Sequence, residues 1–467
     1  MEQRRDKVGR SCSAREADAS VPVGSISRKR RAPPGRREQD LWSHEMSASR
    51  ALNDDVTGAG GATVEARPRQ PPPLNADLLL EIVARTDDPA TVVRCAAASK
   101  PLRRAILDPG FRRRLELRAA ANGGFDPALL VAVSYRLRDS DAVVVLPSRR
   151  LSFADLLRSF KPVSSRNGLV VLCGNQRRPG IDLRVYNTVT GHVVSLPTMD
   201  DEGFGGDTTN MFPPALLSID DGGRSLELLV MYQHCAYHDR HLEIHTISSH
   251  EAKWSAVRNI PWPQGAQQYM NVTSPAPAVI ERSVHWLCIT SSDSDFRSFS
   301  LVILTLHTKP VQATVIKPPQ ECLASIGRGY SGAISRTHSL ILAATAEGKR
   351  LSLVIAEKLV ISLWTLLPEE GSSSWSRQVV IRRREIDSQL ATVLDSYQPI
   401  RFDVFGERSG TVLFWMECVG LVQLNLGTKK AVVLWRCSDP DPIRRWTARA
   451  FLHEIDLVPF LQCMKHY

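Results

Sequence analysis

Short runs rich in Val, Ile, Leu, Thr and Trp recur from about residue 167 to the end of the chain, separated by polar or Gly/Pro turns. Alternation of this kind predicts strands joined by tight connections. Convincing helical periodicity is nearly absent there, and about nineteen strands are expected. The pattern predicts an all-β body over residues 167–467.

Groups of four predicted strands repeat along this body. One group covers 278–281, 284–288, 301–304 and 312–315, and another covers 402–405, 411–415, 421–424 and 431–434. Four strands in each 45 to 60 residues is the rhythm of a propeller blade, and about five such units are recognisable. Residues 140–153, with 142–146 among them, offer strands for a further blade. A pair of stacked sheets is the alternative architecture.

Residues 74–133 have the pattern of a small helical bundle instead. Asp-Pro pairs at 88–89, 108–109 and 126–127 place a capping side chain before a proline in the first turn of a helix. Apolar residues follow at helical spacing, and Gly123-Gly124 ends the fourth helix. So small a bundle has little core of its own, so we expect it to dock against another surface.

The remaining segments complete a division into four parts, an α+β multidomain chain. Residues 1–73 lack apolar periodicity and are expected to be a disordered basic tail, and residues 134–166 are expected to be a connector. The cluster Arg28-Lys29-Arg30-Arg31 in the tail fits the acidic groove of a nuclear import receptor. The expected location is therefore the nucleus, the cytoplasm or both.

Composition narrows the classes of function. The net charge is +10, but residues 1–73 carry +4 and residues 94–118 carry +6, so the β-rich part is close to neutral. A nucleic-acid-binding body would concentrate its positive charge, so nucleic acid is not the expected partner. Nowhere do about 18 apolar residues run uninterrupted by charge, and no membrane partner is expected. The nine cysteines form no CxxC pair, which favours buried thiols in a reducing compartment.

The densest group of chemically active side chains contains His234, Cys235, His238, His241, Glu243 and His245. On a strand, His241, Glu243 and His245 would share one face and could hold zinc. A solvated hairpin is the favoured interpretation, and we expect neither a metal nor another cofactor.

The helical segment also carries residues in a specific order. Leu74, Leu78, Leu79, Ile82 and Arg85 are followed by Val93 and Cys95, and then by Lys100 and Arg103. This order resembles the F-box over about 35 residues. Asn75, Ser99 and Leu102 depart from the Pro, Cys and Trp of that motif. Asn75 and Ser99 can cap the first and third helices, which leaves Pro101 in a first turn where proline is tolerated.

The resemblance implies a partner. F-boxes hold the Skp-type adaptor of an SCF ubiquitin ligase and, through it, the cullin. The adaptor-binding surface implied here consists of Leu74, Leu78, Leu79, Ile82, Val83, Val93 and Leu102. The alternative is that these side chains pack against the chain's own β-domain.

The whole arrangement is similar to plant F-box proteins, in particular a grass set with a C-terminal F-box-associated, propeller-like β-domain. Residues 164–172, residues 186–191 followed by 195–197, and residues 283–288 carry this wider likeness. It implies a non-catalytic substrate receptor of an SCF-type ligase whose target protein is unknown. A non-ligase interaction scaffold and a propeller-type metal-dependent enzyme are the alternatives.

Overall fold

The computed structural model divides the chain into two compact units, residues 1–72 and 73–467. The structure describes residues 75–86, 89–136, 143–146, 154–174, 180–188, 191–199, 211–220, 225–235, 240–249, 251, 253–267, 269–273, 276–291, 300–321, 338–345, 349–367, 374–391, 399–416, 419–436 and 449–455. The predicted tail and its basic import cluster lie outside these residues.

Four helices open the described part: α1 (Ala76–Ala84), α2 (Pro89–Ala98), α3 (Lys100–Ile106) and α4 (Pro109–Ala121). The predicted caps at α1, α3 and α4 are confirmed. Asn75 Oδ1 accepts from the Asp77 amide at 3.0 Å, and Ser99 Oγ accepts from the Leu102 amide at 3.4 Å. Asp108 Oδ1 accepts from the Gly110 amide at 2.7 Å. Asp88 lies outside the described residues.

The end of α4 is also as predicted. Gly123 and Gly124 take positive φ angles of 70° and 89°, and the Gly124 amide donates to the Ala119 carbonyl at 2.9 Å. Asp126 then caps the short 3₁₀ turn η1 (Pro127–Leu129) through the Ala128 amide at 3.1 Å. Glycine suits this helix end because its lack of a Cβ permits the left-handed conformation.

The strands of the described residues form six antiparallel sheets. Their bounds are β1 (Leu130–Arg136), β2 (Val143–Leu146), β3 (Phe160–Arg166), β4 (Leu169–Gly174), β5 (Leu183–Asn187), β6 (Val193–Ser195), β7 (Ala215–Asp220), β8 (Ser225–Cys235), β9 (Arg240–Ser248), β10 (Arg258–Pro261), β11 (Tyr269–Val272), β12 (Ala278–Ile280), β13 (Ser283–Ser291), β14 (Ser300–Thr308), β15 (Val311–Ile316), β16 (Leu340–Thr345), β17 (Arg350–Ala356), β18 (Val360–Leu367), β19 (Ser374–Arg382), β20 (Ile400–Phe405), β21 (Thr411–Met416), β22 (Gly420–Asn425), β23 (Ala431–Arg436) and β24 (Arg449–Glu454). Five sheets hold four or five consecutive strands each, and the sixth has the order β2-β1-β24.

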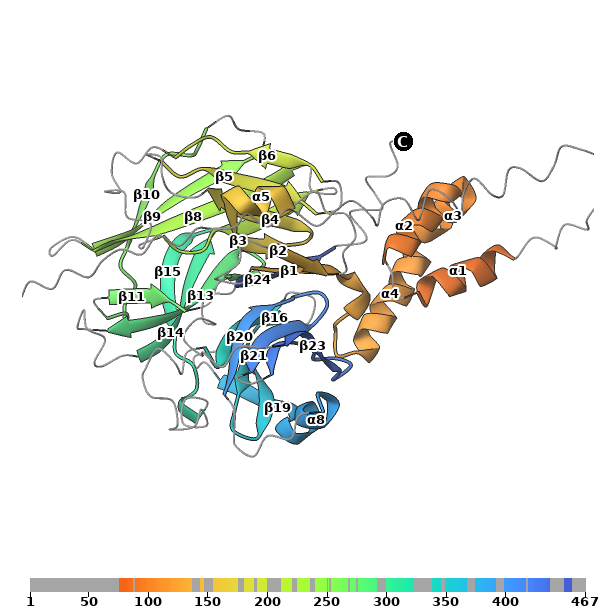
Figure 1. Cartoon of the computed structure of the whole chain (residues 1–467). Helices are drawn as coiled ribbons and strands as arrows, with labels where there is room; N and C mark the ends of the chain where they lie inside the picture. The colour runs from red at the N-terminus through yellow and green to blue at the C-terminus, as the bar shows by residue number, and fades with distance from the viewer. Residues whose placement is uncertain are drawn as a thin grey trace, which may run out of the picture. The chain divides into compact units, whose positions relative to one another are not determined.

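The sheets form a closed ring, as in a propeller (Figure 1). The first strands β3, β7, β12, β16 and β20 lie beside one another in that order, and β24 lies between β20 and β3. Because β24 pairs with β1 from the other end of the domain, the two ends of the β-domain close the ring together. The predicted propeller-like architecture is confirmed, and both four-strand groups identified in the sequence are blades.

Apolar side chains fill the spaces between neighbouring blades. One cluster joins Leu229 and Met231 of β8 to Trp286 of β13, and another joins Leu228 and Val230 of β8 to Val171 of β4. Both faces of a blade are therefore covered, which explains why several strands appear in the sequence as unbroken apolar runs.

The structure differs from the sequence expectations in several places. Strands β11 and β24 were not expected, and residues 130–133 of the expected helical segment begin β1. The expected connector, 134–166, contains the end of β1, all of β2, the helix α5 (Ala154–Ser159) and β3, so it contributes to the ring. The strand expected at 254–257 lies instead at β10. The helix α8 (Arg383–Gln389) was not expected, because its polar sequence resembles a turn. Within the described residues, no helix is long and apolar enough to cross a membrane.

Candidate functional site

The apolar side chains of α1 divide between the core of the helical bundle and its surface. Val83 is 4% exposed and packs with Val92, Ala96, Ile106 and Phe111. Leu78 and Ile82 are 57% and 59% exposed, although they are large and apolar. Being four residues apart, they lie on one face of the helix. The bundle therefore presents a pair of aliphatic side chains, which we call the α1 apolar pair.

The other predicted adaptor-binding residues differ in how far they are buried. Leu79 is half-buried, and Val93 and Leu102 are partly buried against the bundle core. Leu74 lies outside the described residues. Val83 belongs to the core of the bundle, so its surface is not open to a partner. The adaptor contact itself stays a prediction for the whole set.

One exposed residue of the bundle was not singled out in the sequence. Leu117 of α4 is exposed to a similar extent as the α1 apolar pair. It is out of step with Phe111 and Leu115, which contact the bundle core. An apolar residue out of phase with the buried face is the signal that could have identified it.

Ion pairs hold α1 against α4 beside these side chains. Glu81 accepts from Arg85 Nε at 2.7 Å and from Arg114 Nη1 at 3.2 Å. Arg118 donates to the Ala84 and Thr86 carbonyls at 3.0 and 2.8 Å and pairs with Asp126. The helices are thus joined by polar contacts at one side, while the α1 apolar pair is left uncovered.

A second group of charged side chains ties the blades together near the turn between β20 and β21. Arg166 donates to the carbonyls of Leu216 at 2.8 Å and Val279 at 3.2 Å, and its Nε lies 3.5 Å from Glu407 Oε2. Glu454 accepts from the Arg408 and Ser409 amides at 3.2 and 2.7 Å.

Burial raises the pKa of Glu407, and the Arg166 guanidinium acts in the opposite direction. Because the Arg166 guanidinium donates hydrogen bonds to backbone carbonyls of two other blades, the arrangement is suited to holding the ring together.

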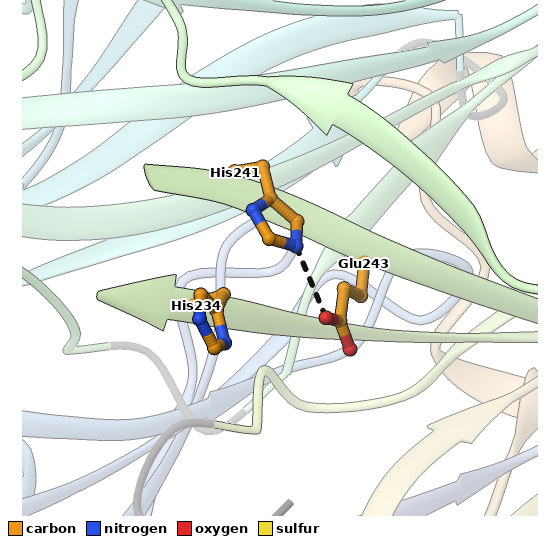
Figure 2. A group of neighbouring side chains, drawn as sticks. All are labelled: His234, His241 and Glu243. Carbon is orange, nitrogen blue, oxygen red and sulfur yellow. Dashed lines mark hydrogen bonds and ion pairs between the residues drawn. The ribbon is translucent and has the colours of Figure 1, made fainter. Parts of the chain in front are cut away.

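The third group lies on the β8–β9 hairpin (Figure 2). His234 on β8 is directly opposite His241 on β9, with ring centroids 4.7 Å apart and ring planes at 26°. Glu243 is two residues beyond His241, and its Oε1 lies 3.1 Å from His241 Nε2. One possible ligand atom from each of the three residues lies within 4.8 Å of the others. Two imidazoles and a carboxylate are a donor set that suits zinc and similar ions.

The sequence placed His241, Glu243 and His245 together, whereas the structure brings His234 into the group in place of His245. His245 is buried beside Tyr232, with ring centroids 6.0 Å apart, and burial lowers its pKa. Only the pairing register shows that His234 lies opposite His241. The side chains of Cys235 and His238 lie outside the described residues.

The buried histidines His285 and His453 and the basic run 382–384 make contacts that stabilise the fold. His285 Nδ1 is 2.9 Å from Thr305 Oγ1, and His453 Nε2 is 2.8 Å from Ser134 Oγ. Burial lowers the pKa of each of these histidines to about 4. Both are therefore neutral near pH 7 and act as hydrogen-bonding groups between paired strands. In the basic run 382–384, Arg383 is buried and bonds Asp387 at 3.1 Å, so the run is not a continuous basic surface.

Solved structures resemble the chain only distantly. Puromycin hydrolase is 11% identical, with a TM-score of 0.34, over 60% of this chain and 39% of its own. TolB from Acinetobacter baumannii is 10% identical, with a TM-score of 0.30, over 68% and 69% of the two chains. An α-L-arabinofuranosidase from Fusarium graminearum is 10% identical, with a TM-score of 0.33, over 61% and 82%. The chain thus spans about two fifths of the length of puromycin hydrolase. No curated protein matches it.

One protein family matches directly. Its model, described as a domain of unknown function (DUF7595), covers residues 132–467. This span begins within β1 and contains the remaining strands of the ring. It leaves α1–α4 outside, so the F-box resemblance of those helices stays a prediction. The chain belongs to the DUF7595 family.

Proposed function

We propose that this chain is the substrate receptor of an SCF-type ubiquitin ligase. In this proposal the helical bundle binds a Skp-type adaptor, which links the chain to a cullin, and the propeller binds a target protein. The observation that carries the proposal is the exposure of Leu78 and Ile82 within a segment that resembles the F-box.

The energetics of the bundle support a partner at this surface. Burying an aliphatic side chain of this size contributes about 1.5–3 kcal/mol. Because Leu78 and Ile82 are exposed in the free chain, most of this stabilisation is available only on binding a partner. Val83, Val93 and Leu102 would act indirectly, by holding the helices in place. Leu79, which is half-buried, would contact the adaptor at the edge of the α1 apolar pair.

The propeller supplies the second half of the proposed function. Its blades share apolar cores, and Arg166 links three of them through backbone carbonyls. A rigid body of this kind can hold a bound target in one orientation. Catalysis would then come from proximity between the lysines of the target and the ubiquitin-loaded enzyme of the assembly, with no reacting group from this chain.

The test is co-expression of the full chain with a Skp-type adaptor. Binding is measured by calorimetry on the purified proteins. The double variant Leu78→Asp/Ile82→Asp should weaken binding at least about 30-fold, since charges replace two apolar contacts at the centre of the interface. The matched control is Val432→Asp, because Val432 is 56% exposed but lies on β23 in the propeller. It should bind like the wild type.

Three results would separate the alternatives. Wild-type affinity in the double variant, with circular dichroism showing a folded chain, would remove the α1 apolar pair from the interface. Failure of the folded wild-type chain to bind the adaptor would overturn the proposal itself. Adaptor binding without recovery of the cullin would indicate the non-ligase scaffold.

A further inference from the structure

We propose that His234, His241 and Glu243 form a binding site for one Zn²⁺-class divalent ion at the end of the β8–β9 hairpin (Figure 2). This proposal is independent of the proposed ligase role. It rests on the donor set, the spacing of the donor atoms and the rigidity of the two strands.

The donor set selects the class of ion. Two imidazole nitrogens and one carboxylate oxygen favour zinc and its transition-metal neighbours over calcium or magnesium, which prefer oxygen ligands throughout. Three protein ligands also leave a fourth position of a tetrahedral ion open to water or to a side chain of a partner. The proposed site is therefore of the open kind.

The spacing is close to what such an ion needs. Bond lengths of about 2.0–2.2 Å place the ligands of a tetrahedral zinc roughly 3.3–3.5 Å from one another. The Glu243 and His241 donors are already 3.1 Å apart, and all three donors lie within 4.8 Å. The His234 ring already faces the His241 ring, with centroids 4.7 Å apart, so only a short movement separates its donor from the others.

Strand β9, which carries His241 and Glu243, is paired on both sides, and β8 is one of its partners. His241 and Glu243 pair with Pro261 and Asn259 of β10, while His241 pairs with His234 on β8. Two residues before His234, Tyr232 is fixed by a bridge to Met211 and by a contact of its hydroxyl with Met199 Sδ at 3.8 Å. Ligands on paired central strands need little ordering when the ion binds.

The three side chains are also reachable from solvent. Each is partly exposed, and none belongs to the apolar cores between the blades. The hydrogen bond between His241 and Glu243 is the competing use of these groups, and an ion would replace it by two coordinate bonds. If the hydrogen bond is the preferred arrangement, the affinity for the metal is low. If coordination of the ion is preferred, the affinity is high.

The experiment is a titration of the full chain, freed of metal by a chelator and dialysed, with Zn²⁺ alone in a calorimeter. A single high-affinity step with one ion per chain is expected. His241→Ala and Glu243→Gln should each weaken that step at least about tenfold, because each removes a direct ligand. His192→Ala is the matched control, since His192 is exposed in the β5–β6 connection, and it should leave the step unchanged.

A second probe guards against misfolded variants. Co²⁺ bound by the wild type should absorb visible light in the pattern of a low-coordinate nitrogen and oxygen site, and His234→Ala should alter that spectrum. Circular dichroism spectra in the presence of chelator should coincide for all variants, which shows that each is folded. Absence of a one-ion step in the wild type, or equal affinity in the wild type and in both ligand variants, would overturn the proposal.

Discussion

The helical bundle and the propeller treat their apolar side chains differently. In the propeller, strands such as β13 and β16 are buried almost throughout, because another blade covers each face. Three of its exposed apolar residues, Val311, Val379 and Val432, lie on the last strands of blades, where no further strand covers them. In the bundle, by contrast, one helix exposes two neighbouring aliphatic side chains.

The difference bears on the proposed partner surface. A ring of sheets satisfies its apolar surface internally, so single exposed residues at its rim are ordinary. A bundle of four short helices has one small core, and the side of α1 that faces away from this core stays uncovered. Exposure on α1 therefore has more functional weight than similar exposure on β23.

The largest expected effect tests the propeller side of the comparison. Trp286 is fully buried between blades, its Nε1 donates to the Pro213 carbonyl at 3.0 Å, and its ring contacts Phe212 at 5.6 Å. Trp286→Ala should lower the free energy of unfolding by about 3–5 kcal/mol, measured in urea. Val257→Ala, at an exposed position, should stay within about 0.5 kcal/mol of the wild type. A loss below about 1 kcal/mol for Trp286→Ala would mean that the blades are not tightly packed there.

The next effect is a pH dependence confined to the β-domain. His285 and His453 have pKa values lowered by burial to about 4, from an ordinary value near 6.5. The unfolded chain then binds protons more readily, so the stability from these groups is complete above about pH 6.5 and is lost as pH falls towards 4. Each histidine contributes at most about 1.4 kcal/mol per pH unit in that window.

Urea unfolding at several pH values between 7 and 5 measures this dependence. His285→Gln and His453→Gln should each make the decline less steep than in the wild type. His192→Gln, at an exposed position, should leave it unchanged. Parallel curves for all four proteins would show that the two buried histidines are not the source.

The smallest effect sharpens the comparison within α1 itself. Val83→Ala should cost about 2 kcal/mol of unfolding free energy, because it opens a cavity in the bundle core. Leu78→Ala should change stability by less than about 0.5 kcal/mol, since its side chain is exposed in the free chain. Adaptor binding should respond in the opposite order: Leu78→Ala should weaken it more than Val83→Ala does. Equal stability losses at both positions would mean that Leu78 is covered within the chain.

Local sequence predicted much of the fold. The caps at Asn75, Ser99 and Asp108 and the glycine stop after α4 follow from side-chain chemistry within a few residues. The alternation of apolar and polar positions predicted the blades. Weak local signals failed at α8 and at β3, where polar residues form elements that neighbouring sheets stabilise. Packing context overrides intrinsic propensity at such positions.

The candidate sites were also predicted in part from the sequence and decided in part by the tertiary structure. From the sequence alone came the helical bundle, the β-domain, the order of F-box-like residues and the histidine-rich hairpin. Only the tertiary structure decided that Val83 is buried while Leu78 and Ile82 are exposed, that His234 rather than His245 joins His241 and Glu243, and that β24 closes the ring with β1. The physical reason is the distance along the chain over which each interaction acts. Caps and periodicity act between neighbours along the chain, whereas exposure, register and closure depend on contacts between residues far apart in it.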